Sequence, residues 1–97
     1  MKVEVRFFTS LREIVNKRAE NLTFADGDKV TVDLVLKNLS NKYGKPFTEY
    51  VYDAKTGQPK NFLQFLVNGT STSNLNGLET ELKDGTVLGV LPPVGGG

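Results

Sequence analysis

The chain has 97 residues, of which 38% are hydrophobic and 24% are charged, and its formal net charge is +1. This length and balance predict one globular domain and exclude a disordered chain and a strongly basic nucleic-acid-binding protein. The absence of cysteine and histidine excludes disulfides, thiolate nucleophiles, histidine-assisted hydrolysis and zinc sites built from the usual ligands.

Charge is distributed in a way that favours neither export nor a large anionic partner. Lys2 and Glu4 stand where a signal peptide needs an apolar run, and no apolar run could span a bilayer, so we expect a cytoplasmic protein with no membrane partner. Lys and Arg are spread along the chain, which predicts a solvated face and no nucleic-acid partner. The acidic pairs Asp26/Asp28 and Glu79/Glu81 lie in turn-like stretches, so we predict no catalytic site within the domain and no bound cofactor.

The first elements are a strand and a short helix. Residues 2–8 alternate between polar and apolar side chains, with one apolar face made by Val3, Val5 and Phe7. Phe8 breaks the alternation because it falls on the polar side. Ser10 and Glu13 have the spacing of a capping box, which predicts that a short helix starts after Ser10.

The next segment predicts a second strand followed by the one long helix. Residues 20–24 alternate again, and Thr31 is placed to cap a helix that Gly44 would end. Apolar side chains recur between these two residues at helical spacing, at Val32, Val35, Leu36, Leu39 and Tyr43. The pattern weakens over residues 45–61, where a further turn of helix is possible.

The last third predicts three strands. Residues 62–68 alternate, Asn68-Gly69 is a turn signal, and a short edge strand follows over residues 70–73. Residues 86–91 form the final strand, which we place centrally beside the first. We therefore expect an α+β domain, a mixed sheet packed on one long helix. The predicted core is Val5, Phe7, Val32, Val35, Leu39, Phe65, Val67, Leu88 and Val90.

The chain then ends in two prolines, a valine and three glycines, residues 92–97. Proline cannot continue a ladder, and glycine can enter a slot too narrow for a side chain. We therefore divide the chain into a domain over residues 1–91 and a flexible tail over residues 92–97. Fully extended, six residues reach at most roughly 20 Å, enough to bring a terminal carboxylate into the active site of a partner.

Several stretches together resemble the ubiquitin-like sulfur carriers of the MoaD type, which are small subunits of molybdopterin synthase, and their archaeal small modifier relatives. The matching stretches are Val5-Arg6-Phe7-Phe8 with Leu11-Arg12-Glu13, Thr31-Val32, Leu66-Val67-Asn68-Gly69, Leu82-Lys83-Asp84-Gly85 and the ending Leu91-Pro92-Pro93-Val94-Gly95-Gly96-Gly97. The Pro-Pro-Val-x-Gly-Gly ending is the most specific of them. The resemblance implies the ubiquitin-like β-grasp fold.

The resemblance also implies a mechanism. A ubiquitin-activating-type adenylating enzyme would use ATP to adenylate the Gly97 carboxylate, and sulfur would then replace the adenylate to give a thiocarboxylate. In the MoaD branch this sulfur passes to a pterin precursor bound by the large molybdopterin synthase subunit, so the chain would be the sulfur-donating subunit without a catalytic site of its own. The implied partner-binding residues are Phe8, Leu91, Pro92, Pro93, Val94, Gly95 and Gly96. A third apolar contact of the family aligns with Ser71, which is polar here.

Two other functions are compatible with the same residues. A protein modifier would link Gly97 to lysines of other proteins through the same activated carboxylate. A β-grasp interaction module would bind partners without any chemistry at the tail.

Overall fold

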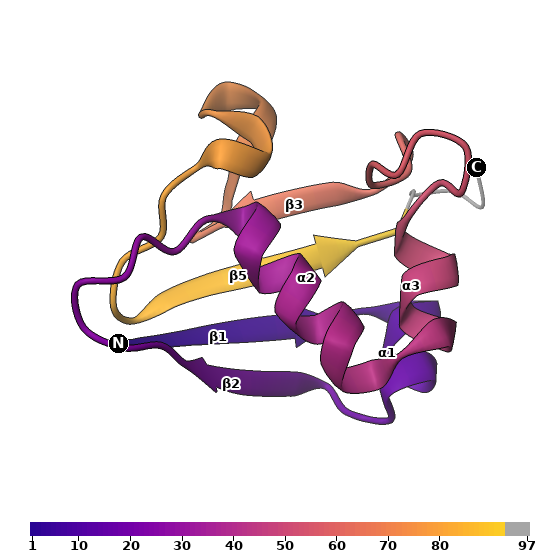
Figure 1. Ribbon diagram of the computed structural model, residues 1–97, viewed down its shortest axis with the longest axis horizontal. Helices are drawn as coiled ribbons and strands as arrows, with labels where there is room; N and C mark the ends of the chain where they lie inside the picture. The colour runs from indigo at the N-terminus through magenta and orange to yellow at the C-terminus, as the bar shows by residue number, and fades with distance from the viewer. Residues whose placement is uncertain (93–97) are drawn as a thin grey trace.

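The computed structural model of the protein describes residues 1–92, and its centre is a five-stranded mixed sheet (Figure 1). The strands are β1 (Lys2–Phe7), β2 (Ala19–Thr23), β3 (Gln64–Val67), β4 (Thr70–Ser71) and β5 (Thr86–Leu91). Their order across the sheet is β2-β1-β5-β3-β4. The prediction that the final strand lies centrally beside the first is therefore confirmed, and β1 and β5 are parallel.

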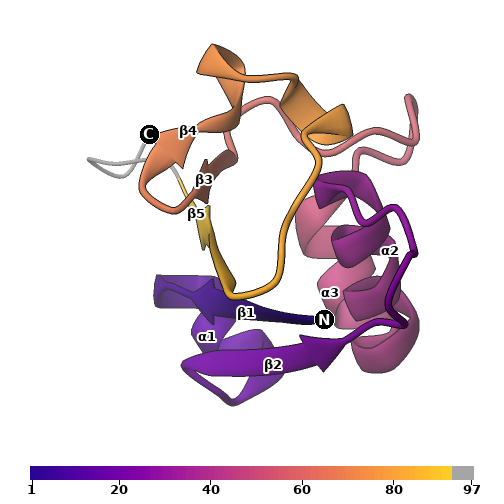
Figure 2. The ribbon, with the colours of Figure 1, turned by 90° about the vertical axis from the view of Figure 1, so that its left-hand side faces the viewer.

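The helices form a layer against this sheet, with α2 crossing its inner face (Figures 1 and 2). They are α1 (Thr9–Val15), α2 (Val32–Tyr43) and α3 (Lys45–Val51), with 3₁₀ turns η1 (Thr72–Asn74) and η2 (Gly77–Glu79) after β4. A mixed sheet with β1 and β5 side by side at its centre and one long helix across it is the β-grasp arrangement. The fold implied by the resemblance is confirmed.

The ends of α2 follow the local chemistry of the sequence. The Leu34 amide donates to Thr31 Oγ1 over 3.2 Å, so Thr31 is the N-cap as predicted. Gly44 ends the helix with a φ of 75° and donates its amide to the Ser40 carbonyl. This positive φ is easily adopted by glycine, and it turns the chain at once into α3.

The capping box predicted at the start of α1 is wrong. The helix begins at Thr9, directly after β1, and its N-cap is Phe8, whose side chain accepts no hydrogen bond. Ser10 therefore lies inside the first turn, where its backbone is already helical and its hydroxyl cannot cap. The helix begins earlier than the capping pattern indicated because the chain turns at once when β1 ends.

The core lies between α2 and the inner face of the sheet. Val3, Val5 and Phe7 of β1 are fully buried, as the alternation predicted. The other predicted core residues are also buried, at Val32, Val35, Leu39, Phe65, Leu88 and Val90. Val67 is only half-buried and packs on the margin of this cluster. The helix α3 adds Phe47 and Val51, which the weaker pattern of residues 45–61 had left open.

Candidate functional site

Phe8 and Leu91, the two partner-binding residues proposed within the domain, lie together on the outer face of the sheet. The register of the parallel pair β1–β5 sets Phe7 opposite Val90, so the residue after each of them emerges at the same end of the sheet. Gly89 lies between their side chains. A Cβ atom built on Gly89 would lie 3.2 Å from Leu91 Cδ1 and 3.6 Å from Phe8 Cε2. The absence of a side chain at Gly89 therefore lets Phe8 and Leu91 close over the strand.

Two further apolar residues complete this surface, which we call the outer-face patch: Phe8, Leu66, Val87 and Leu91. These four residues line a small hollow of about 160 Å³ together with Arg6, Gly69 and Gly89. Each of the four is half-buried, in contrast to the core residues. Half-buried apolar side chains around a hollow are typical of a surface that binds another protein.

Sequence reasoning had not assigned Leu66 and Val87 to the site. The period-2 spacing of Val87 and Leu91 within the last strand puts both side chains on one face, and this spacing was the signal in the sequence that could have identified Val87. Leu66 comes from β3, which pairs with β5 on the side away from β1, and only that pairing brings it to the patch. Ser71 does not line the hollow. Its partner in the β3–β4 pair is Leu66, so an apolar residue next to Ser71 occupies the patch.

The patch stands where the chain leaves β5. Pro92 is half-buried and directly follows the patch residue Leu91. The other proposed tail residues, Pro93, Val94, Gly95, Gly96 and Gly97, lie outside the described residues. The geometry thus places a small apolar surface at the point where the proposed tail begins.

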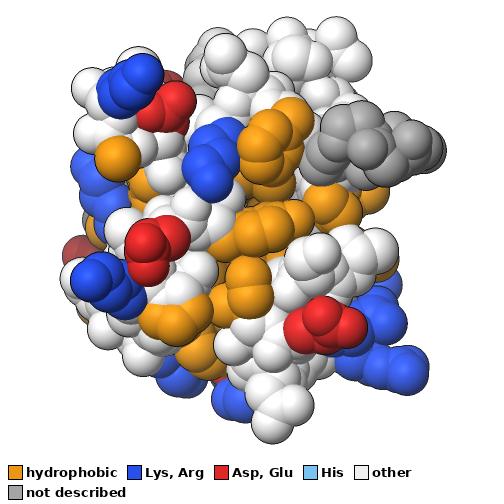
Figure 3. Space-filling view, turned by 90° about the vertical axis from the view of Figure 1, so that its right-hand side faces the viewer, with side chains coloured by type: hydrophobic (Ala, Val, Ile, Leu, Met, Phe, Trp, Pro, Cys, Tyr) orange, Lys and Arg blue, Asp and Glu red, His pale blue; other side chains and the backbone are white. Residues whose placement is uncertain are grey.

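The end of the molecule nearest this exit is also partly apolar. Figure 3 views this end and shows hydrophobic side chains in a band between charged groups. The elements here are α1, α3 and the loop before β3 (Figure 1), which carry half-buried Ile14 and Tyr50 and the exposed Phe62. Lys60 Nζ lies 5.8 Å from the centroid of the Phe62 ring, so a charged group borders the apolar band.

The buried carboxylate of Glu20 is the strongest electrostatic feature of the inner face. Burial by itself would raise the pKa of Glu20, but hydrogen bonds from Lys17, Lys42 and Tyr43 outweigh it and lower this pKa to about 2. The carboxylate joins β2 to the end of α2. Since each of its partners is a donor that holds it in place, we interpret this cluster as structural.

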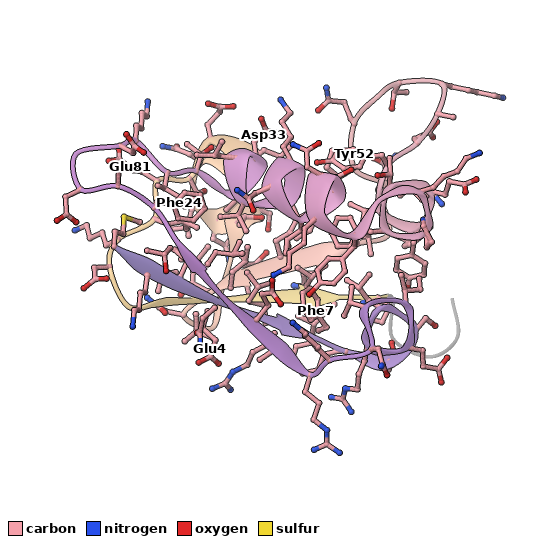
Figure 4. All side chains as sticks on the ribbon, turned by 60° about the horizontal axis from the view of Figure 1, so that its bottom comes forward. Glu4, Phe7, Phe24, Asp33, Tyr52 and Glu81 are labelled. Carbon is pink, nitrogen blue, oxygen red and sulfur yellow. The ribbon has the colours of Figure 1, made fainter. Side chains whose placement is uncertain are left out.

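Tyr52 is a second residue whose pKa is shifted. Its hydroxyl is buried and has no hydrogen-bond partner within the described part of the chain. Burial, and then the negative charge of Asp33, raise the pKa of Tyr52 to about 12. Both residues lie at the helical layer, opposite the outer-face residue Glu4 (Figure 4). A phenol that stays protonated offers no general base.

Other site classes find no support in residues 1–92. No cluster of three acidic, histidine or cysteine residues able to hold a metal ion occurs in this range. None of the helices described there is both long and apolar enough to cross a membrane. The acidic pairs Asp26/Asp28 and Glu79/Glu81 are exposed, as predicted.

Two proteins of other organisms are similar to this chain in sequence. The chain is 34% identical over 97 residues to "Small archaeal modifier protein 3" of Haloferax volcanii, covering all of both chains. It is 32% identical over 72 residues to a "Putative sulfur carrier protein" of Archaeoglobus fulgidus, covering 74% of this chain and 80% of the relative.

The chain is also similar to solved structures of small archaeal modifier and molybdopterin-converting proteins. Small archaeal modifier protein 1 of Methanosarcina acetivorans is 35% identical, with a TM-score of 0.78 over 99% of this chain and 96% of the other. The "Putative molybdopterin converting factor, subunit 1" of Pyrococcus furiosus is 28% identical, with a TM-score of 0.72 over 97% and 99% of the two chains. The model of the ThiS family matches residues 5–97. The chain therefore belongs to the ThiS family, whose members are ubiquitin-like β-grasp sulfur carriers.

Proposed function

We propose that this protein carries sulfur as a thiocarboxylate on Gly97. The carboxylate oxygen attacks the α-phosphate of ATP in an adenylating enzyme, which forms an acyl adenylate and releases pyrophosphate. A sulfide-level donor then attacks the carbonyl carbon, AMP leaves, and the C–S bond of the thiocarboxylate remains. The observation that carries this proposal is the outer-face patch at the point where the chain leaves β5.

The composition is compatible with a carrier that holds the sulfur while a separate enzyme supplies the chemistry. The carrier needs no cysteine, histidine or metal of its own, because the enzyme supplies the nucleotide chemistry and the reactive sulfur sits on the carrier's terminus. The domain contributes recognition and rigidity. The patch would hold the body against the enzyme while the residues after Leu91 reach its nucleotide, in keeping with the extended length of the tail.

For the acceptor of the sulfur we propose a molybdopterin precursor, bound by a large synthase subunit that docks on the same patch. The MoaD-type stretches of the sequence support this acceptor, and so does the likeness to the Pyrococcus furiosus structure, which is named for molybdopterin conversion. The carrier would then use one surface twice, first for the adenylating enzyme and next for the large subunit.

A second function, conjugation of Gly97 to lysines of other proteins, is favoured by one specific observation. The Haloferax volcanii relative that matches along its whole length is named as a modifier protein. The acyl adenylate is common to both functions, and they differ only in whether sulfur or a lysine amine becomes attached to the carbonyl carbon.

The experiment that tests the proposal is intact-mass analysis after incubation with the adenylating enzyme of the same organism, ATP and a sulfide donor. We expect a mass gain equal to the replacement of one oxygen by one sulfur, located at Gly97. Two tail variants serve as matched controls. Deletion of Gly97 moves the carboxylate back by up to ~3.5 Å, and an added alanine moves it forward, so neither variant should gain mass.

Three outcomes separate the alternatives. An unchanged mass, under conditions in which another carrier reacts with its own enzyme, would refute the sulfur-carrier function. Gly97 joined to lysines of other proteins in cells, without thiocarboxylate, would favour the modifier function. Thiocarboxylate that a large molybdopterin synthase subunit cannot consume would refute the proposed acceptor while leaving the carrier chemistry intact.

A further inference from the structure

Gly89 differs from the other glycines within residues 1–92. The other six have positive φ angles, from 58° at Gly77 to 92° at Gly27, a conformation that residues with a side chain seldom adopt. Gly89 lies inside β5, and its φ is not positive. Glycine is unfavourable inside a strand, because it loses more conformational freedom on folding than alanine does. The backbone conformation at this position therefore does not require a glycine.

The sheet is regular on both sides of Gly89. The residue pairs with Arg6 of β1 and with Leu66 of β3, and both registers continue through it without an extra residue. A β-bulge, which is a common reason for a glycine inside a strand, therefore does not occur at this position. The other common reason is that a second group comes close to the backbone, and that reason fits Gly89.

The hollow of the outer-face patch occupies the space above Gly89. Along β5, Gly89 stands between Val87 and Leu91, which take the same face of the sheet. Across the sheet it stands between Arg6 and Leu66, and all four neighbours line the hollow. Neighbouring strands lie about 4.8 Å apart, so the walls on β1 and β3 are roughly 10 Å apart and leave room for one inserted side chain.

The lining of the hollow selects an apolar group. Its surface is mostly apolar, although Arg6 contributes to it. Arg6 Nε donates to Glu4 Oε2 over 2.6 Å, so the charge of Arg6 is already paired on the outer face, where Glu4 lies (Figure 4). An apolar cavity of about 150 Å³ in a protein takes up a molecule of the size of benzene. A leucine or phenylalanine side chain therefore suits this hollow of about 160 Å³.

A methyl group at Gly89 would fill the floor of the hollow without disrupting the fold. A Cβ atom there would lie 3.6 Å from Phe8 Cε2 and 3.8 Å from Leu66 Cβ, which are ordinary van der Waals contacts. It would lie 3.2 Å from Leu91 Cδ1, so only the end of the Leu91 side chain would have to shift, by a few tenths of an ångström. The domain can thus accommodate an alanine here, but a side chain inserted from outside would meet the added methyl group.

We infer that Gly89 is a specificity-determining residue, which keeps the hollow open for one apolar side chain of the adenylating enzyme, of about the size of leucine or phenylalanine. This inference rests on the proposed function. The hollow adjoins Leu91 and the exit of the chain at Pro92, so an enzyme that acts on Gly97 would cover it. An apolar anchor that fills a pocket near the centre of an interface typically carries much of the binding energy.

The test compares the wild type with Gly89→Ala and with a matched control, Thr23→Val. Thr23 is exposed on the outer face and pairs with Lys2 at the other end of the sheet, so this control also adds a methyl group to the outer face but away from the hollow. Affinity for the purified adenylating enzyme of the same organism is measured by calorimetric titration, and stability by thermal melting. Thiocarboxylate formation is measured at saturating enzyme.

We expect Gly89→Ala to melt at or above the temperature of the wild type and to bind the enzyme about tenfold more weakly, since one added methyl group is enough to exclude a group from an apolar pocket. Thr23→Val should change the affinity less than about twofold. All three proteins should still form thiocarboxylate at saturating enzyme, because none of the changes touches the tail.

A double-mutant cycle identifies the inserted side chain. Apolar surface residues of the enzyme are replaced by alanine one at a time, and each variant is titrated with the wild-type carrier and with Gly89→Ala. One replacement should weaken binding to the wild type about tenfold but binding to Gly89→Ala less than about twofold, since the two changes remove the same contact.

Three results would overturn the inference: equal affinity of Gly89→Ala and the wild type, the lack of any enzyme residue coupled to Gly89, or a melting temperature of Gly89→Ala more than about 5 °C below that of the wild type. The last would mean that the glycine serves the packing of the domain itself. In each case, thiocarboxylate formation by the wild type would leave the proposed function standing. A wild-type carrier that forms no thiocarboxylate would instead refute the proposed function.

Discussion

Phe7 and Phe8 are neighbours in the chain and lie on opposite faces of the sheet. Phe7 is 0% exposed and meets the Tyr43 ring edge-on, with the ring centroids 6.2 Å apart, beneath the helical layer. Phe8 is half-buried on the outer face, where Leu91 closes against it over Gly89. The same residue type thus serves folding at one position and a candidate partner surface at the next.

The difference arises from what covers each face. The inner face is sealed by α2, and the side chains of β5 that point there, Leu88 and Val90, are fully buried. Figure 2 shows α2 and α3 on one side of the sheet. Val87 and Leu91, which alternate with the buried pair along β5, remain half-buried on the other side. An apolar side chain that its own fold leaves half-exposed can still contribute binding free energy when a partner buries the rest of its surface.

The largest loss of stability should come from truncating Phe7, which is buried on the inner face of the sheet. Phe7→Ala would leave a cavity beneath α2 and cost roughly 3–5 kcal/mol of unfolding free energy. Urea titration monitored by circular dichroism measures this loss. A cost below about 1 kcal/mol would show that the inner face is not the closed core described here.

An intermediate effect should come from Glu20, the charged group of the inner face. Since its pKa is lowered to about 2 from an unfolded value of about 4.3, its stabilising contribution is full above the unfolded value and is lost as the pH falls toward 2. Glu20→Gln removes the charge from hydrogen bonds to two lysines and a tyrosine and should cost roughly 1–3 kcal/mol at pH 7. Thermal unfolding of the wild type and of Glu20→Gln between pH 7 and pH 2 should show that the difference between their melting temperatures becomes smaller as the pH drops. A difference that does not change with pH would mean that the charge of the carboxylate contributes nothing to stability.

The smallest effect on stability should come from the outer face. Phe8→Arg replaces a half-buried ring with an arginine, whose aliphatic stem can stay on the sheet while its charged end reaches water. The unfolding free energy should therefore change by about 0.5 kcal/mol or less. Its affinity for the adenylating enzyme should nevertheless fall at least tenfold, because an apolar anchor is lost from the patch. Calorimetric titration alongside thermal melting separates the two effects. Unfolding of Phe8→Arg at ordinary temperature would place Phe8 in the core and remove it from the site.

Several features of this protein could be predicted from short stretches of sequence. The alternation of Val3, Val5 and Phe7, the Thr31 cap and the Gly44 terminus all act within a few residues, so local spacing was enough to predict them. The placement of Phe8 on the polar side of its strand had the same local origin. The capping box at Ser10 failed because the preceding strand, and not the local pattern, set where α1 begins.

The assembled surfaces were decided by the tertiary structure. Phe8 and Leu91 meet because β1 and β5 pair in parallel with one particular register, and Leu66 joins them only because β3 lies on the other side of β5. Local periodicity shows which face a side chain takes, but the pairing of strands more than 80 residues apart depends on how the whole core packs. The sequence by itself therefore determined most of the elements and suggested Gly97 as the reactive residue that we propose, and the packed sheet decided which side chains surround the point where the chain leaves β5.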